Sequence, residues 1–245
     1  MASLGAADID LWWVDLDAEP TGPELALGPL TEDERARAEA FRFEHHRVRW
    51  ARSRAALRWV LAAYAGGSPA AVRFRAGAWG KPYLLSPRVP LHFNLSRADG
   101  LAAIVVSRIE SIGVDVELAI RGADMTEVVS QFYSSRERRL FRQLPVHERA
   151  RAALKCWTSK EAFVKATGRG LSQPLDGFDV SLDPACPPAV LSVEGQAAAA
   201  RDWTLYAISP DDDYVGTVAV RVEPGSGGAR LRERGNIHGE GSAQV

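Results

Sequence analysis

The stretch Trp157-Thr-Ser-Lys-Glu-Ala-Phe-Val-Lys-Ala-Thr-Gly168 predicts the helix around which the rest of the chain is organised. Trp157, Glu161 and Lys165 recur every four residues, so they share one face of a helix. Gly168 supplies the left-handed conformation that commonly ends a helix, and we expect the helix to stop just before it. Taken alone, Glu161 and Lys165 are also typical of an ordinary solvated i,i+4 pair, worth roughly 0.2–0.5 kcal/mol.

A second stretch, Gly113-Val-Asp-Val-Glu117, alternates apolar and acidic residues as a half-buried strand does. Asp115 and Glu117 therefore project from the same face of that strand. Two carboxylates about 4 Å apart repel by roughly 4 kcal/mol at an effective dielectric near 20, so a third, Glu161, would need a counter-charge. Carboxylates without His or Cys select a hard cation such as Mg²⁺. Asp115, Glu117 and Glu161 are candidate metal ligands; alternatively, the two strand residues line a hydrated sheet face.

Composition excludes several classes of protein. The 245 residues are 46% hydrophobic and 25% charged, which is typical of a globular protein with a large core. The net charge of −1 argues against a nucleic-acid binder, so any basic site must be local. No apolar run approaches 18 residues, and we expect no membrane insertion. Cys156 and Cys186 form no metal-binding motif, and we interpret both as reduced, buried thiols of a cytoplasmic protein.

Lysine is rare in a chain that otherwise uses arginine. Of 30 basic residues, lysines occupy only positions 81, 155, 160 and 165. Lysines in Gly80-Lys-Pro82 and on both sides of Glu161 indicate sites that need a compact ammonium group instead of a guanidinium fork. Chance clustering is the alternative.

The first half of the chain is expected to contain strands and two helices. We expect strands at 9–16, 71–75, 81–85, 91–95 and 101–107, and helices from a capping box at Thr31 to about 45 and over 47–64. The polar turn 96–100 is interpreted as the longer loop of a hairpin.

The second half begins with a strand and then becomes helical. We expect a strand at 112–118, helices at 125–132, at 135–144 from the capping box Ser134-x-x-Glu137, and from 147 onward, and strands at 178–182, 203–208 and 214–222. Residues 225–245 lack periodicity and are expected to form a disordered tail. The predicted fold class is α+β, with an N-terminal lobe at 1–112 and a C-terminal lobe at 113–224.

A Mg²⁺ site of this kind in an enzyme usually holds a diphosphate, whose remaining charge needs cations. The candidate cations, and one hydroxyl donor, are Lys165, Lys160, Lys81, Arg97, Arg49, Arg37 and Ser96. For any single arginine, a solvated surface position is the simpler explanation. The chain has no Walker A, Gly-x-Ser-x-Gly or Gly-x-Gly-x-x-Gly motif.

The acidic strand and the helix motif together resemble the signature pair of the 4′-phosphopantetheinyl transferases, in the larger, Sfp-type class. Four weaker motifs follow the order of that family: Gly80-Lys-Pro82, Phe93-Asn-Leu-Ser96, Phe132-Tyr-Ser-x-x-Glu137 and Gly170-Leu-Ser-x-Pro-Leu175. The resemblance extends over residues 9–222.

The resemblance implies two similar α+β lobes related by a pseudo-two-fold, with the active site in the cleft between them. It implies a monomeric enzyme that moves the 4′-phosphopantetheine arm of coenzyme A to a serine of an apo acyl- or peptidyl-carrier protein, releasing adenosine 3′,5′-bisphosphate. Carrier proteins of this kind present an acidic helix, which the basic run Arg136–Arg142 beside the loop 121–131 would suit. A solvated helix face is the alternative for that run.

The resemblance also implies roles for single residues. Asp115, Glu117 and Glu161 would bind Mg²⁺ around the pyrophosphate; Glu161 would be the base for the carrier serine, directly or through a water, and Lys165 would neutralise the transferred phosphate. The residues matched to coenzyme A phosphates are Arg49, Lys81 and Ser96, with Arg97, Lys160 and Lys165 as further candidates.

The sequence departs from the family pattern at Arg97. The family usually has His after Asn-Leu-Ser, and Arg97 keeps a donor and a permanent charge there but no titratable group. Two other functions remain open: a binding module that retains coenzyme A or carrier affinity without chemistry, and a different Mg²⁺ enzyme such as a phosphodiesterase.

Overall fold

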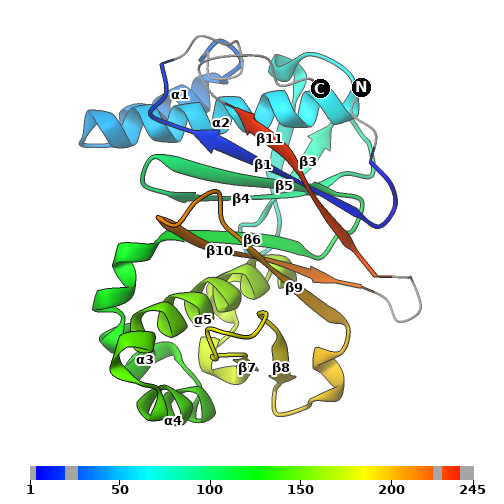
Figure 1. Cartoon of the computed structure of the whole chain (residues 1–245). Helices are drawn as coiled ribbons and strands as arrows, with labels where there is room; N and C mark the ends of the chain where they lie inside the picture. The colour runs from blue at the N-terminus through cyan, green and yellow to red at the C-terminus, as the bar shows by residue number, and fades with distance from the viewer. Residues whose placement is uncertain (1–3, 20–26, 223–227, 238–245) are drawn as a thin grey trace.

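The computed structural model describes residues 4–19, 27–222 and 228–237. Two sheets lie face to face between two long helices (Figure 1). The first sheet has the order β11-β1-β5-β4, with β11 at Arg230–Ile237, β1 at Asp8–Asp15, β5 at Leu101–Ser107 and β4 at His92–Ala98. The second has the order β6-β10-β9, with β6 at Ile112–Leu118, β10 at Tyr214–Arg221 and β9 at Trp203–Ile208.

Each sheet is covered on its outer face by one 22-residue helix, α2 (Glu44–Ala65) over the first and α5 (Val146–Thr167) over the second. The alternation of side chains along the strands explains this arrangement. In β1, Trp12 and Val14 pack with residues of α2, while Leu11 and Trp13 point to the opposite face.

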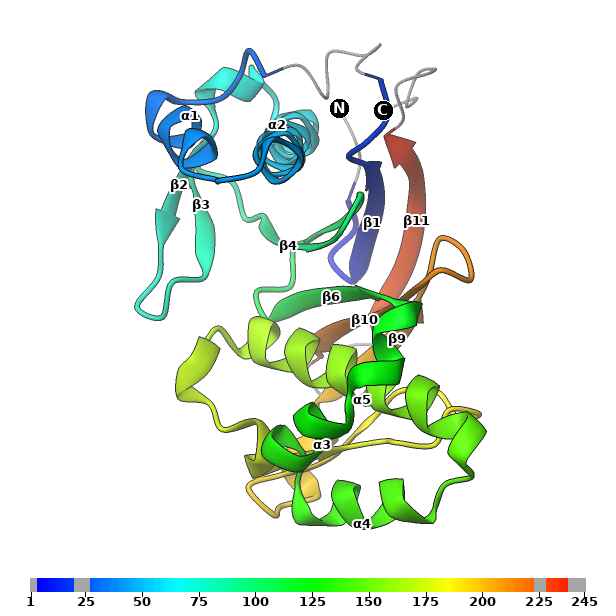
Figure 2. The same cartoon turned by 90° about the vertical axis from the view of Figure 1, so that its left-hand side faces the viewer.

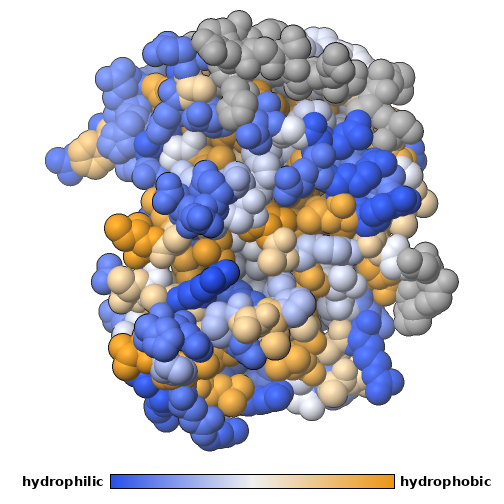
Figure 3. All heavy atoms as spheres, viewed as in Figure 1, coloured by the Kyte–Doolittle hydropathy of each residue, from blue (hydrophilic) through white to orange (hydrophobic). Residues whose placement is uncertain are grey.

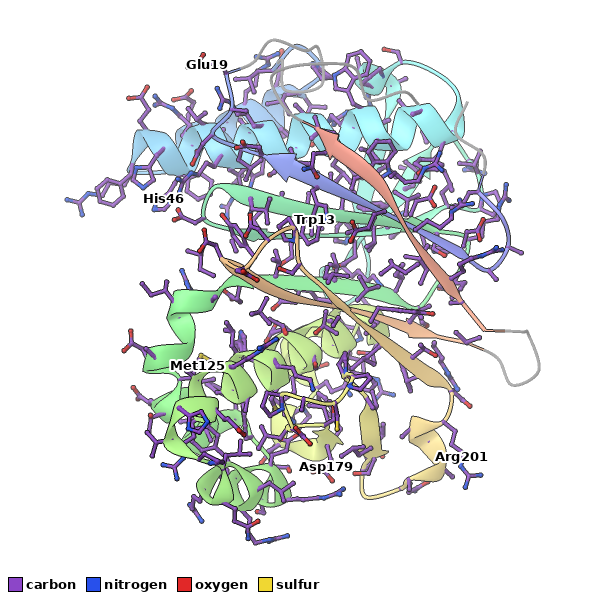
Figure 4. All side chains as sticks on the ribbon, viewed as in Figure 1. Trp13, Glu19, His46, Met125, Asp179 and Arg201 are labelled. Carbon is purple, nitrogen blue, oxygen red and sulfur yellow. The ribbon has the colours of Figure 1, made fainter. Side chains whose placement is uncertain are left out.

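The inner faces of the two sheets form a shared apolar core. Leu11 and Trp13 of β1 pack there with Val114 and Val116 of β6 and with Val218 of β10. Trp13 lies between the sheets in Figure 4. Because the apolar residues of β6 point inward, the intervening Asp115 must face α5.

Shorter elements surround these layers. In the first half they are α1 (Glu32–Glu39), η2 (Pro69–Ala71) and the two-stranded hairpin of β2 (Arg73–Ala76) and β3 (Pro82–Ser86). In the second half they are η3 (Ala119–Asp124), α3 (Thr126–Phe132), α4 (Ser135–Gln143), η4 (Gly170–Ser172), η5 (Leu175–Gly177), β7 (Phe178–Val180), β8 (Val190–Val193) and η6 (Ala198–Ala200). The β2–β3 hairpin stands apart from the first sheet in Figure 2.

Several local predictions are confirmed. Thr31 and Ser134 each form a complete capping box at the start of a helix. α5 ends at Thr167, and Gly168 follows in the left-handed conformation with φ of 71°. The strand 112–118 has the predicted bounds.

Among the described residues, none of the helices combines the length and the hydropathy that a membrane-spanning helix needs.

Other local predictions are wrong. The polar turn is shorter than expected, because β4 continues to Ala98 and only Asp99 and Gly100 connect it to β5. Asp99 has φ of 51°, which Asp tolerates and which a two-residue hairpin turn requires. The helix beginning at Thr31 ends at Glu39, since α2 starts separately at Glu44. β8 was not predicted. Cys156 is buried as expected, whereas Cys186 is exposed.

The predicted disordered tail is the largest correction. Residues 230–237 form β11, which runs parallel to β1 and lies beside it along its whole length (Figure 1). Its arginines pair with buried acids: Arg232 Nη2 lies 2.7 Å from Asp10 Oδ1 and Arg232 Nη1 lies 2.8 Å from Asp8 Oδ2. The rest of the predicted tail falls on residues outside the described ranges, apart from 228 and 229. The first sheet therefore uses both ends of the chain, so the predicted lobe 1–112 is not self-contained. The pseudo-two-fold stays a prediction.

Candidate functional site

The acidic strand and the helix motif meet at one cavity of about 370 Å³, which we call the polar cavity. Its lining residues are Leu95, Ser96, Arg97, Asp115, Glu117, Trp157, Glu161 and Lys165. The three predicted metal ligands, Asp115, Glu117 and Glu161, are among them, and so is Lys165. The cavity therefore lies where β4, β6 and α5 come together.

Asp115 is the most buried of the three carboxylates, with a relative exposure of 4%. Its Oδ1 accepts hydrogen bonds from Ser96 Oγ at 2.9 Å and from Lys165 Nζ at 2.7 Å. Its Oδ2 is buried and has no hydrogen-bond partner. Because an unpaired buried carboxylate oxygen is costly, Oδ2 is the atom of this site that most needs a ligand.

Glu117 and Glu161 are half-buried and face the same cavity. Burial raises the pKa of both carboxyls above the usual range, and the Asp115 carboxylate raises both further. Lys165 opposes the rise at both, and a hydrogen bond from Trp157 opposes it at Glu117. The three acids thus repel one another, as the sequence predicted, and Lys165 supplies part of the counter-charge.

The close approach of α5 to β6 depends on Gly113. A Cβ atom at this position would lie 2.2 Å from Ala162 O and 2.5 Å from Ala166 N, so only glycine fits. On the neighbouring strand, Thr217 Oγ1 lies 3.1 Å from Thr158 Oγ1 of α5. Gly113 of the acidic strand and Thr158 of the helix motif are therefore among the residues that let α5 lie close to β6. This close approach sets the distance between Glu161 and the strand.

The position of β4 beside β6 depends on polar side chains of the motif Phe93-Asn-Leu-Ser96. Asn94 Oδ1 accepts a hydrogen bond from the backbone N–H of Val114 at 3.0 Å. Ser96 Oγ accepts one from the N–H of Val116 at 3.4 Å, in addition to its bond with Asp115. Asn94 was not predicted as a site residue; a buried asparagine inside a strand pattern is the signal that could have identified it.

A second, larger cavity of about 600 Å³ adjoins the polar cavity and shares Leu95, Glu161 and Lys165 with it. We call it the large cavity. Most of its other side chains are apolar, among them Trp79, Pro82, Phe132, Val164, Pro174 and Leu175. Trp79 and Phe132 were not predicted as site residues. The Phe132 ring packs edge-on against the Trp157 ring, with the ring centroids 5.9 Å apart. Phe132 lines the large cavity and Trp157 lines the polar cavity, so this pair lies at the boundary between them.

The prediction that Lys160 binds a phosphate is wrong. Lys160 is fully buried, and its ammonium lies 2.8 Å from Glu137 Oε2. It also donates to the backbone oxygens of Leu175 at 2.7 Å and Phe178 at 2.8 Å. The side chains of successive helical residues point about 100° apart, so Lys160, which precedes Glu161, points away from the polar cavity and into the core of the second half.

Arg49 and Arg97 differ in their surroundings. Arg49 donates to Asp17 through Nε at 2.7 Å and through Nη2 at 2.6 Å, and it pairs with Asp99 as well. It lines neither the polar cavity nor the large cavity, and a phosphate would have to displace a carboxylate to reach its donors. Arg97 lines the polar cavity, and its Nη1 donates to Ser53 Oγ at 3.0 Å.

Comparison with known proteins identifies the family. Residues 111–219, which hold both acidic motifs, match the 4′-phosphopantetheinyl transferase superfamily. The 4′-phosphopantetheinyl transferase HetI of Nostoc sp. (strain PCC 7120 / SAG 25.82 / UTEX 2576) is 35% identical over 221 residues, which cover 89% of this chain and 90% of HetI. The chain belongs to the 4′-phosphopantetheinyl transferase family.

Other phosphopantetheinyl transferases match shorter stretches. Sfp of Bacillus subtilis (strain 168) is 33% identical over 112 residues, covering 45% of this chain and 48% of Sfp. Two solved structures of ACPS from Chronobacterium ammoniagenes, one apo and one in complex with CoA, are 22% identical with a TM-score of 0.34. They cover 46% of this chain, and 96% and 97% of their own chains.

The acidic residues of this phosphopantetheinyl transferase fit a hard cation by their donor set and by the unpartnered Asp115 Oδ2. Among the described residues, no three His, Cys, Asp or Glu side chains are already gathered closely enough to hold a metal ion. The metal site of Asp115, Glu117 and Glu161 therefore stays a prediction.

Proposed function

We propose that this chain transfers the 4′-phosphopantetheine arm of coenzyme A to a serine of an apo acyl- or peptidyl-carrier protein and releases adenosine 3′,5′-bisphosphate. The observation that carries the proposal is the convergence of Asp115, Glu117, Glu161 and Lys165 on the polar cavity of a phosphopantetheinyl transferase. By resemblance, we further propose a cytoplasmic monomer built of two pseudo-symmetric lobes.

Glu161 is the proposed general base. Its carboxylate takes the proton of the carrier serine, directly or through a water, as the serine oxygen bonds to the pantetheine-bearing phosphorus. The bond from that phosphorus to the bridging oxygen breaks, and the electron pair leaves with adenosine 3′,5′-bisphosphate. The raised pKa of Glu161 favours this role, because a base works best when its pKa lies near the working pH.

Lys165 and Ser96 are proposed to hold the transferring phosphate. Lys165 Nζ lies 3.0 Å from Ser96 Oγ and 2.7 Å from Asp115 Oδ1, so the ammonium is oriented before any substrate arrives. Preorganised positive charge stabilises the charge that builds up on phosphate oxygens during transfer. Arg97, at the rim of the polar cavity, is proposed to contact a further phosphate of coenzyme A.

Mg²⁺ is the proposed cofactor, held by Asp115, Glu117 and Glu161. It would neutralise the diphosphate and so make the phosphorus easier to attack. The large cavity, with its apolar lining, is the proposed place for the pantetheine arm, and the polar cavity for the diphosphate.

The test is incubation with coenzyme A, Mg²⁺ and a panel of apo-carrier proteins, read by intact mass. We expect one carrier or more to gain the mass of a single phosphopantetheine arm. Asp115→Ala should lose Mg²⁺ binding, and Glu161→Gln should lower the transfer rate at least about 10²-fold, the usual effect of losing a general base.

Glu148→Gln is the matched control, since Glu148 lies in the first turn of the same helix and lines neither the polar cavity nor the large cavity. Turnover of coenzyme A or nucleotides without a carrier would support a phosphodiesterase instead. Binding of coenzyme A without transfer to any carrier would support a binding module.

A further inference from the structure

The β2–β3 hairpin, residues 73–86, is held to the rest of the molecule differently at its two ends. Near its base, Phe74 packs at a tilt against Phe93 with ring centroids 5.4 Å apart, and Leu84 packs against the core between the first sheet and α2. Within the described ranges, neither strand pairs with a strand of another sheet. The tip, residues 77–81, reaches toward the end of α5 in Figure 2. The position of the tip must therefore be set by contacts other than strand pairing.

The ammonium group of Lys81 makes those contacts. Its Nζ donates to Ile112 O at 2.9 Å and to Ala166 O at 3.3 Å. Ile112 begins β6, and Ala166 lies in the last turn of α5, where carbonyl oxygens have no partner within the helix and carry partial negative charge. A single side chain thus joins the tip of the hairpin to both elements that carry the acidic site.

The surface beneath the tip is shaped to receive it. A Cβ atom on Gly170 would lie 3.3 Å from Trp79 O, and one on Gly168 would lie 3.5 Å from Lys81 Cδ. Both glycines also have positive φ, at 54° and 71°. The two glycines that follow α5 therefore lie in van der Waals range of the tip, and the closer approach is that of Gly170 to the backbone of Trp79.

Lys81 also separates two cavities. It lines the large cavity together with Trp79, and it lines a third cavity of about 440 Å³ together with His92 and Glu110 on its other side. Pro82 and Gly168 line both cavities as well, so Lys81 belongs to the wall between them.

We propose that Lys81 is a positioning residue that latches the tip of the β2–β3 hairpin to the end of α5, and so fixes the wall of the large cavity. This role differs from direct phosphate binding, because two of the three donors of the ammonium point to backbone oxygens of the protein. Only the kinetic arm of the test rests on the proposed function.

The test is hydrogen–deuterium exchange of the full chain without substrates. In Lys81→Met, which keeps most of the apolar stem, amides of residues 76–81 should exchange about tenfold faster, the loss expected for charge-assisted hydrogen bonds. Amides of β4 and β6 should keep their protection. Lys81→Arg retains donors and charge and should give an intermediate rate.

Arg75→Met is the matched control, since it removes one exposed cation from the same hairpin. An unchanged tip in Lys81→Met, equal acceleration in Arg75→Met, or equal acceleration throughout β4 and β6 would each overturn the proposal. These measurements need no enzymatic activity, so they remain decisive even if no carrier protein is modified.

The kinetic arm separates a latch from a phosphate ligand. A latch predicts that Lys81→Met raises KM for coenzyme A and accelerates tip exchange in the substrate-free protein. A residue that only binds phosphate would raise KM and leave the substrate-free exchange unchanged, which would also overturn the proposal.

Discussion

At the scale of single residues, the site places three acids where they repel one another. A carboxyl whose pKa is raised in the folded state lowers stability above that pKa, and stability rises as the pH falls through it. Burial and Asp115 raise the pKa of Glu161, so its charge opposes folding at neutral pH. Glu161→Gln should therefore increase the free energy of unfolding at pH 7, by up to about 1 kcal/mol for a half-buried group.

Urea unfolding at pH 7 and pH 5 measures this effect. The advantage of Glu161→Gln should be smaller at pH 5, because a carboxyl with a raised pKa takes up its proton at a higher pH in the folded than in the unfolded chain, and Glu148→Gln should have little effect at either pH. Mg²⁺ should stabilise the wild type, because an ion that binds only the folded state shifts the equilibrium toward it. A variant less stable than the wild type at pH 7 would mean that Lys165 outweighs the two acids.

Arg97 provides a second test at this scale. The guanidinium of Arg97, the proposed phosphate contact, stays positively charged at all working pH values, whereas a histidine side chain has an ordinary pKa near 6.5. Arg97→His should therefore bind coenzyme A normally near pH 6 and lose affinity between pH 6 and 8. The measurement is KM for coenzyme A against pH, with the wild type expected to stay flat over that range. An equally flat profile for Arg97→His would remove Arg97 from the phosphate site.

At the scale of elements, β11 is the edge strand that pairs with β1 and covers its buried acids. Asp10 is fully buried, and its Oδ2 accepts a hydrogen bond from Tyr64 at 2.6 Å while Arg232 of β11 binds its Oδ1. A chain ending after Ala229 should lose about 3 kcal/mol or more of unfolding free energy, because it leaves buried carboxylates without their arginines.

A chain ending after Ile237 is the control for this truncation, since it keeps the whole of β11. The urea midpoint of both chains measures the difference. Equal midpoints would mean that β11 contributes nothing to the stability of the sheet on which it lies.

The elements also separate what the sequence could predict from what it could not. Periodicity placed β6 and α5 correctly, because both bury one face and end at clear signals such as Gly168. It missed β11, because an edge strand with arginines at alternate positions has no apolar face. The phosphate-binding role predicted for Lys160 is also wrong. The rarity of lysine in this chain marks the residue as unusual but does not show which way its side chain points.

At the scale of the whole molecule, the second half exposes large apolar side chains beside its basic helix. Ile120 and Val146 are 80% and 78% exposed, and both belong to the half that carries the proposed metal ligands. Hydrophobic and hydrophilic residues are interspersed over α3 and α4 at the lower left of Figure 3. α4 carries the predicted basic run, in which Arg138 donates to Ser130 O at 3.0 Å while Arg139 is exposed. This surface has the mixed apolar and basic character that an acidic carrier helix would require.

Reversing Arg138 and Arg139 to Glu should therefore raise KM for the carrier and leave KM for coenzyme A unchanged, because neither arginine lines any of the three cavities. Electrostatic attraction weakens with ionic strength, so the wild-type KM for the carrier should rise with salt more steeply than that of the variant. Reversing Arg88 and Arg201 gives the same change in net charge elsewhere, with Arg201 on the opposite lower edge in Figure 4. If both double variants show the same carrier KM and salt dependence, overall charge and not this surface governs the encounter.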